Sequence, residues 1–175
     1  SYYTLRAKKI IEDLVKQVKH GKVFVNGNYS TVCSCPIEML QATIGAFYGQ
    51  QILAKGNIVS RRFEPKTVIC SRNPHVTMGN VLVTENVHNE LIEKYMNLTN
   101  EIVVINTINE NIMQRMSGMD MDSDTMLITD NEILIRAGQR NYDKFLVPTN
   151  LINPEKKNVE YTPQNLARLD NDTSE

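Results

Sequence analysis

Short runs of β-branched and aliphatic residues, separated by turn signals, are the feature that most restricts the fold of this chain. The runs predict strands at residues 22–25, 29–33, 57–63, 67–70, 81–84, 101–107 and 126–129. Asn26-Gly27-Asn28 lies between the first two runs and is a strong signal for a hairpin turn. Six or more short strands with a few helices between them favour a small closed or nearly closed barrel.

Helical patterns lie before, between and after these runs. Apolar residues at helical spacing predict a helix over the first 20 residues that ends at His20-Gly21 and docks on a core through its apolar face. Pro36 can open a second helix that runs to about Tyr48. Further helices are predicted at 87–96 and 132–139. The expected fold class is therefore α+β, mainly β.

The 175 residues are enough for one core domain with appendages. We expect an N-terminal helix at 1–21, a barrel with inserts at 22–131, a helix and extension at 132–152 and a polar tail at 153–175. The formal net charge of -1 gives no global basic signal. No apolar run is long enough to span a membrane, and no signal peptide is present. We expect Cys33, Cys35 and Cys70 to be free thiols in a reducing compartment. We therefore expect a cytoplasmic protein without a membrane partner.

Three aspartates at alternate positions, Asp120, Asp122 and Asp124, lie inside an otherwise apolar stretch. Three carboxylates held together without a counter-ion repel one another, and each raises the pKa of its neighbours. A hard divalent cation removes that conflict, because Mg²⁺ prefers carboxylate oxygens together with waters and substrate phosphates. The spacing therefore predicts a magnesium site, which Mn²⁺ could also fill, that handles nucleotide phosphates.

Two other interpretations of the aspartates exist. An EF-hand loop that starts at Asp120 would need Gly at its sixth position and Glu at its twelfth, where this chain has Thr125 and Asn131. That mismatch argues against a calcium loop of this type. A purely structural acidic turn stays open on the motif alone.

A second polar segment, residues 71–80, connects two predicted strands. Pro74 and Gly79 bracket a rigid loop. Arg72 carries a planar fork that suits a phosphate or a sugar hydroxyl, although a surface arginine in a turn is the commoner case. His75 is a candidate general acid, or simply a hydrogen-bonding loop residue.

The two segments together resemble a known family. Arg72-Asn73-Pro74, then Gly79-Asn80-Val81, then Ser117-Gly118 before the aspartates follow the motif order of polymerases with a double-psi β-barrel core. The resemblance is closer to the cellular RNA-dependent RNA polymerases of RNA silencing, which have R-N-P-C-L-H-P-G-D and S-G-S-D-L-D-G-D, and to their bacterial and phage single-chain relatives. It is more distant to the largest subunit of multisubunit RNA polymerases, which has N-R-A-P and N-A-D-F-D-G-D.

This resemblance covers roughly residues 22–131 and implies a double-psi β-barrel and an RNA polymerase, a nucleotidyltransferase that copies RNA or DNA. The three aspartates would be catalytic and would hold the Mg²⁺. Substrate binding would fall to Arg72, Asn73 and Gly118. The implied partners are nucleoside triphosphates, template and product nucleic acid, and a second barrel in the remainder of a longer polypeptide, without which the activity would be weak or absent.

Four positions depart from the family pattern. Ser123 stands where the family has Gly between its second and third aspartates. Thr77 replaces a His, Met78 a Pro and Asn80 an Asp. Because Gly is used where the backbone needs a positive φ or a close approach, we expect either a strained Ser123 or a slightly different loop. None of these changes removes a metal ligand.

Two other classes of function stay open. A metal-dependent phosphohydrolase or nuclease would need further ligands near the triad, for which Asp130 is the obvious candidate. A non-catalytic barrel that serves as an interaction module would bind no divalent metal there. Lys55, Arg61 and Arg62 either face nucleic acid or form an exposed solubilising surface.

Overall fold

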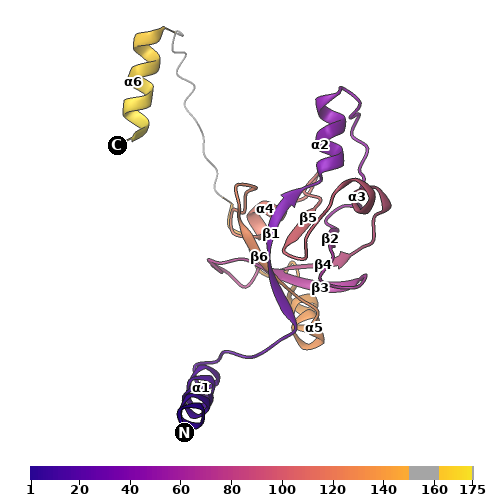
Figure 1. Cartoon of the computed structure of the whole chain (residues 1–175). Helices are drawn as coiled ribbons and strands as arrows, with labels where there is room; N and C mark the ends of the chain where they lie inside the picture. Colours follow the sequence, from indigo (N-terminus) through magenta and orange to yellow (C-terminus); the bar gives the residue numbers. More distant parts are fainter. Residues whose placement is uncertain (150–161, 175) are drawn as a thin grey trace.

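Six short strands close into one barrel in the computed structural model, which describes residues 1–149 and 162–174 (Figure 1). The strands are β1 Gly27–Ser34, β2 Ile58–Ser60, β3 Lys66–Ser71, β4 Leu82–Asn86, β5 Ile102–Ile105 and β6 Thr125–Thr129. The helices are α1 Tyr2–Lys19, α2 Pro36–Thr43, α3 Glu90–Tyr95, α4 Ile112–Arg115, α5 Glu132–Asn141 and α6 Pro163–Ser174. The predicted α+β class and the small barrel are confirmed.

The strand order around the barrel is β1-β5-β2-β4-β3-β6, and β6 closes the barrel against β1. The pairs β1/β5 and β2/β4 are parallel, and the other four pairs are antiparallel. This pattern maps onto itself when β1, β2 and β3 are exchanged for β4, β5 and β6. The two halves of the barrel therefore have the same connectivity, although the sequence contains no obvious repeat.

Alternate residues of the strands fill the barrel interior, as the two-residue period of a strand requires. Val68 and Cys70 of β3 and Met126 and Ile128 of β6 are fully buried in one apolar cluster. A second cluster lies outside the barrel and includes Cys35, Leu53, Ile92 and Leu98, together with residues of β2 and β5. These two clusters form the core that holds the loops between the strands in place.

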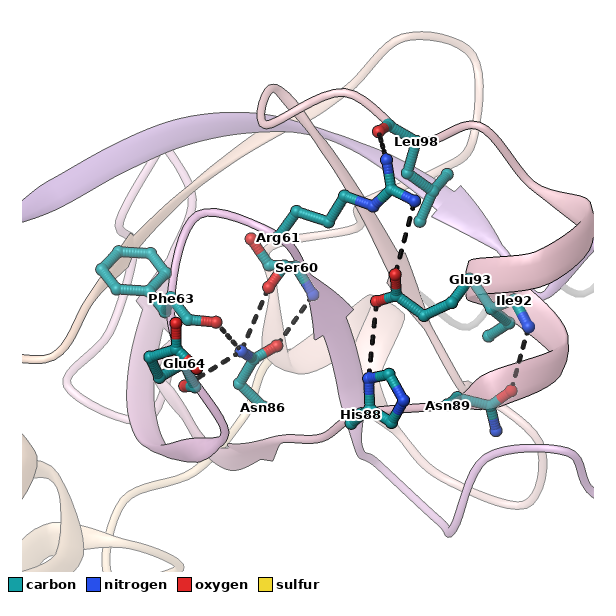
Figure 2. A network of polar contacts seen from close by, with 10 residues as sticks. All are labelled: Ser60, Arg61, Phe63, Glu64, Asn86, His88, Asn89, Ile92, Glu93 and Leu98. Atoms are coloured by element: carbon teal, nitrogen blue, oxygen red, sulfur yellow. Dashed lines mark hydrogen bonds and ion pairs between the residues drawn. The ribbon is translucent and has the colours of Figure 1, made fainter.

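Asn86, at the end of β4, is the centre of a buried polar network (Figure 2). Its Oδ1 accepts the backbone N–H of Ser60 at 2.8 Å, and its Nδ2 donates to the carbonyl of Phe63 at 2.7 Å. The same amide nitrogen lies 3.1 Å from the carbonyl of Ser60 and 3.3 Å from that of Glu64. One side chain thus provides hydrogen-bond partners for backbone groups of the tight connection between β2 and β3, where regular sheet pairing is missing.

The predicted strand at 22–25 and the hairpin after it are wrong. Residues 22–25 have no regular structure, and β1 begins at Gly27, inside the predicted turn. One edge of β1 pairs with β5 and the other with β6, so no edge is left for a hairpin partner. Asn26 instead donates from Nδ2 to Oδ1 of Asp130 at 2.9 Å. Barrel closure overrides the local turn signal.

Several predicted elements exist but have different bounds. The helix predicted from Pro36 to about Tyr48 ends at Thr43, before Gly45, whose φ is +70°. The strands predicted at 57–63 and 101–107 shorten to β2 and β5, and the helix predicted at 87–96 shortens to α3. The short helix α4 was not predicted. The predicted polar tail contains α6, but its residues 153–161 and 175 lie outside the described residues.

Helix α1 has the predicted position, but its apolar side is not docked. None of its residues is buried, and Figure 1 shows it apart from the barrel at the end of an extended connection. Ile10, Ile11, Val15 and Val18 are each about half exposed or more. None of the described helices combines the length and the apolar character of a transmembrane span.

Candidate metal centre

The aspartates lie on the loop that connects α4 to β6. The chain reverses at Ser117 and Gly118, whose φ values are 58° and 68°. Met116 and Met119 on either side are fully buried, and the N–H of Met119 donates to the carbonyl of Met113 at 2.9 Å. The buried methionines explain why apolar residues surround the aspartates: they anchor the loop, and the carboxylates lie outside the core.

One oxygen from each of Asp120, Asp122 and Asp124 lies within 4.8 Å of the other two. Asp120 and Asp122 are exposed, and Asp124 is half-buried. The alternate spacing brings the carboxylates together on a looped backbone rather than on a strand, because β6 begins only at Thr125. All three donors are hard carboxylate oxygens, so the donor set fits Mg²⁺ or Mn²⁺.

Hydrogen bonds inside the loop fix its shape. The N–H of Asp120 donates to Oδ2 of Asp124 at 2.9 Å, and the N–H of Asp122 lies 3.4 Å from Oδ1 of Asp120. Ser123 has a φ of 101°, a backbone conformation that residues other than Gly rarely adopt. The strain expected from its place in the resembled motif is therefore present.

The pKa values of Asp122 and Asp124 are shifted in opposite directions. The side chain of Asp120, by a hydrogen bond and then by its charge, holds the pKa of Asp122 above its ordinary value. The backbone N–H of Asp120, followed by the side chain of Arg72, holds the pKa of Asp124 below its ordinary value. Asp124 is therefore the more firmly ionised of the two, whereas the hydrogen bond to Asp120 and the charge of Asp120 favour the protonated form of Asp122.

Arg72 directly follows β3 and reaches the aspartate loop. Its Nη2 lies 2.7 Å from Oδ1 of Asp124, and its Nη1 donates to the carbonyl of Ser117 at 2.9 Å. The pair joins residues 52 positions apart in the sequence. The structure thus brings together the two segments that the sequence singled out separately.

The other predicted site residues in these segments are less engaged. Asn73 is exposed and precedes Pro74 in the turn after Arg72. Gly118 is exposed, and a Cβ added to it would meet nothing within 4 Å. His75 is exposed as well, and nothing in its surroundings singles it out as a general acid.

Two of the basic residues considered for nucleic-acid binding are occupied within the chain. Lys55 lies 3.0 Å from Glu110. Arg61 donates to the carbonyl of Leu98 at 2.7 Å and lies 3.4 Å from Glu93 (Figure 2). Both side chains therefore have an acidic partner within the chain.

Asn80 is a supporting residue whose role sequence reasoning missed. It is almost fully buried, and its Oδ1 accepts the N–H of Thr77 at 2.7 Å while its Nδ2 donates to the carbonyl of Arg115 at 3.0 Å. It thereby ties the 71–80 loop to the end of α4, where the aspartate loop begins. Its place in the Gly-Asn-Val motif was visible in the sequence, but its contact was not.

A hollow of about 300 Å³ lies beside this junction. It is lined by Val76, Asn80, Gln114, Ser117, Gly118 and Pro148. Four of these residues come from the two segments that form the site. The aspartate loop therefore borders a space that can admit part of a small molecule.

Comparison with known proteins gives no assignment: no family model matches the chain, and no curated protein matches it.

Proposed function

We propose that this chain is the metal-binding barrel of a nucleotidyltransferase of the RNA polymerase type. The observation that carries the proposal is the convergence of Asp120, Asp122 and Asp124, whose carboxylate oxygens lie within 4.8 Å of one another. Such a set would hold Mg²⁺ or Mn²⁺. The ion, when bound, would supply activation of a 3′-hydroxyl and neutralisation of triphosphate charge.

The residues around the triad have roles that fit this chemistry. Arg72 presents a guanidinium fork at the edge of the aspartates, where it can bind a hydroxyl or a phosphate oxygen. The open space over Gly118 lets a ligand approach the backbone closely. We assign Arg72, Asn73 and Gly118 to substrate binding, since the same motif positions are used in the resembled family. No nucleophilic side chain is needed, because the 3′-hydroxyl is the nucleophile.

The strand pairing supports a barrel of the double-psi type. When β1, β2 and β3 are exchanged for β4, β5 and β6, the two parallel and the four antiparallel strand pairs stay the same. A barrel built from two interlocked halves of like connectivity has this symmetry. We include in the proposal the partners that such a polymerase needs: nucleoside triphosphates, a template, a product and a second barrel from a longer polypeptide.

The hydrolase alternative is less well supported. It calls for further ligands that converge on the triad, and Asp130 is engaged elsewhere, 2.9 Å from Nζ of Lys66 and 2.9 Å from Nδ2 of Asn26. Among the described residues, the group that could hold a metal consists of the three aspartates alone. A triad without added bases suits a reaction whose nucleophile and leaving group both belong to substrates.

Nucleotide incorporation tests the proposal. The longer polypeptide that we expect to carry this barrel is assayed on single-stranded RNA and DNA templates with Mg²⁺ or Mn²⁺, beside its Asp122→Asn variant. We expect metal-dependent synthesis by the wild type and none by the variant, with circular dichroism showing that the variant is folded. Equal synthesis by both proteins would refute the assignment of the aspartates, and absence of synthesis on both templates would favour the hydrolase or the interaction module.

A further inference from the structure

Arg72 holds the position that a cation would take at one edge of the triad. Its Nη2 lies 2.7 Å from Oδ1 of Asp124, and the exposed fractions of the two side chains are 17% and 20%. The other carboxylate oxygen of Asp124 accepts the N–H of Asp120. Both oxygens of Asp124 thus already have a donor, and the positive charge beside them comes from the chain itself.

We propose that Arg72 is the resident counter-ion of this site and that a divalent cation competes with it for Asp124. The inference rests on the proposed function, because it assumes that the triad binds a divalent metal. An ion that uses all three carboxylates would come within a few ångströms of Nη2. Like charges a few ångströms apart repel, more strongly at a partly buried site than in water, and the double charge of a divalent ion doubles that repulsion.

The second contact of Arg72 makes such a competition feasible. Nη1 donates to the carbonyl of Ser117, which belongs to the backbone and carries no charge to be neutralised. The guanidinium can therefore keep this hydrogen bond while Nη2 leaves Asp124. Without a metal, Arg72 satisfies the innermost carboxylate; with a metal, that carboxylate is released for coordination. The cost of this exchange lowers the affinity of the wild-type site for the ion.

Binding of Mn²⁺ to the 175-residue chain measures this competition directly, by electron paramagnetic resonance of the free ion. The test variant is Arg72→Gln, which removes the charge. Arg72→Lys keeps a positive charge at this position, and Arg62→Gln removes the charge of an exposed arginine elsewhere in the chain. We expect Arg72→Gln to bind Mn²⁺ at least about fivefold more tightly than wild type, with both controls within about twofold.

Wild-type protein provides a second readout that does not depend on how the variants fold. Mg²⁺ is added while the side-chain Nε–Hε resonance of Arg72, identified by its loss in Arg72→Lys, is followed by NMR beside the amides of the aspartate loop. We expect both sets of signals to shift with the same midpoint. Loop amides that shift while the Arg72 resonance stays unchanged would overturn the competition.

The outcomes separate this inference from the function on which it rests. If Mn²⁺ binds the wild type, and Arg72→Gln binds it equally or more weakly than Arg62→Gln does, Arg72 positions Asp124 and does not compete. The metal site would stand in that case, and only the counter-ion role would be lost. If neither the wild type nor any folded variant binds Mn²⁺, the metal site and the proposed function are both refuted.

Discussion

A Cβ atom added to Gly138 in α5 would lie 2.6 Å from Cδ1 of Ile69 in β3. The same atom would lie 2.8 Å from Cγ2 of Val83 in β4. Real Cβ atoms essentially never approach other atoms so closely, so the helix sits as near to the barrel as a residue without a side chain permits. This contact holds α5 against the strands that precede and follow the Arg72 loop.

Gly138→Ala should therefore destabilise the protein, although Ala favours a helix over Gly by about 1 kcal/mol. Overpacking against two β-branched side chains typically costs about 1–3 kcal/mol, and we expect a net loss of about 1 kcal/mol in the free energy of unfolding. Urea denaturation measures it. Gln139→Ala, at the exposed neighbouring position, should stay within about 0.5 kcal/mol of wild type. A stabilised Gly138→Ala variant would contradict the close contact.

Ser123→Gly should stabilise the protein, because Ser123 has a φ of 101°. Such a conformation costs a residue with a Cβ about 1–3 kcal/mol. Gly offsets part of this gain, because a chain with Gly has more conformational entropy when unfolded. We expect a net gain of about 0.5–1 kcal/mol in chemical denaturation. Ser123→Ala keeps the Cβ and should show no comparable gain. Equal effects of the two substitutions would mean that backbone strain is not the cause.

Asn86→Ala should be among the most destabilising polar substitutions in the chain. It removes a buried amide that serves the N–H of Ser60 and the carbonyls of Ser60, Phe63 and Glu64. Because these backbone groups would be left without their partner, we expect a loss of about 2–4 kcal/mol in the free energy of unfolding. The exposed Asn97→Ala is the matched control, and its effect should not exceed about 0.5 kcal/mol. A loss in Asn86→Ala as small as that of the control would argue against the network.

Asp130 should contribute to stability in a pH-dependent way. Hydrogen bonding to Lys66, 2.9 Å away, is the main cause that holds the pKa of Asp130 below its ordinary value. Since the folded-state pKa is depressed, the contribution is present above the unfolded pKa of about 3.9 and is lost as the pH falls toward the folded value. Asp130→Asn should cost about 0.5–1 kcal/mol at pH 7, because the pair is partly exposed.

Denaturation of wild type and Asp130→Asn at a series of pH values checks this expectation. The difference in unfolding free energy should shrink below about pH 4, where the unfolded carboxylate is protonated. Asp13→Asn, an equal charge change on the exposed helix α1, should leave the pH dependence unchanged. A difference that grows on acidification would have the wrong sign for a depressed pKa.

Removal of residues 1–21 should leave the stability of the barrel unchanged within about 0.5 kcal/mol, because none of the residues of α1 is buried. Far-ultraviolet circular dichroism should show a loss of helical signal without a shift of the urea midpoint. A loss of more than about 1 kcal/mol in unfolding free energy would show that α1 packs on the barrel in solution.

The sequence by itself determined most of the local structure. The β-branched runs predicted the positions of five of the six strands, although the predicted ends of these strands were inexact. This was possible because the alternation of buried and exposed residues is visible in the sequence of each strand. Strand β1 was also located, but its start was misjudged. The alternate spacing of Asp120, Asp122 and Asp124 also predicted that their carboxylates lie together, which the structure shows.

The tertiary structure alone decided which segments meet. Barrel closure used both edges of β1 and left residues 22–25 outside the sheet, against a strong local turn signal. It also placed Arg72 against Asp124 and Asn80 against Arg115, across 52 and 35 positions of sequence. Such contacts follow from the register and order of all six strands together. Periodicity in one segment reports which of its faces is buried, but carries no information about the partner that covers it.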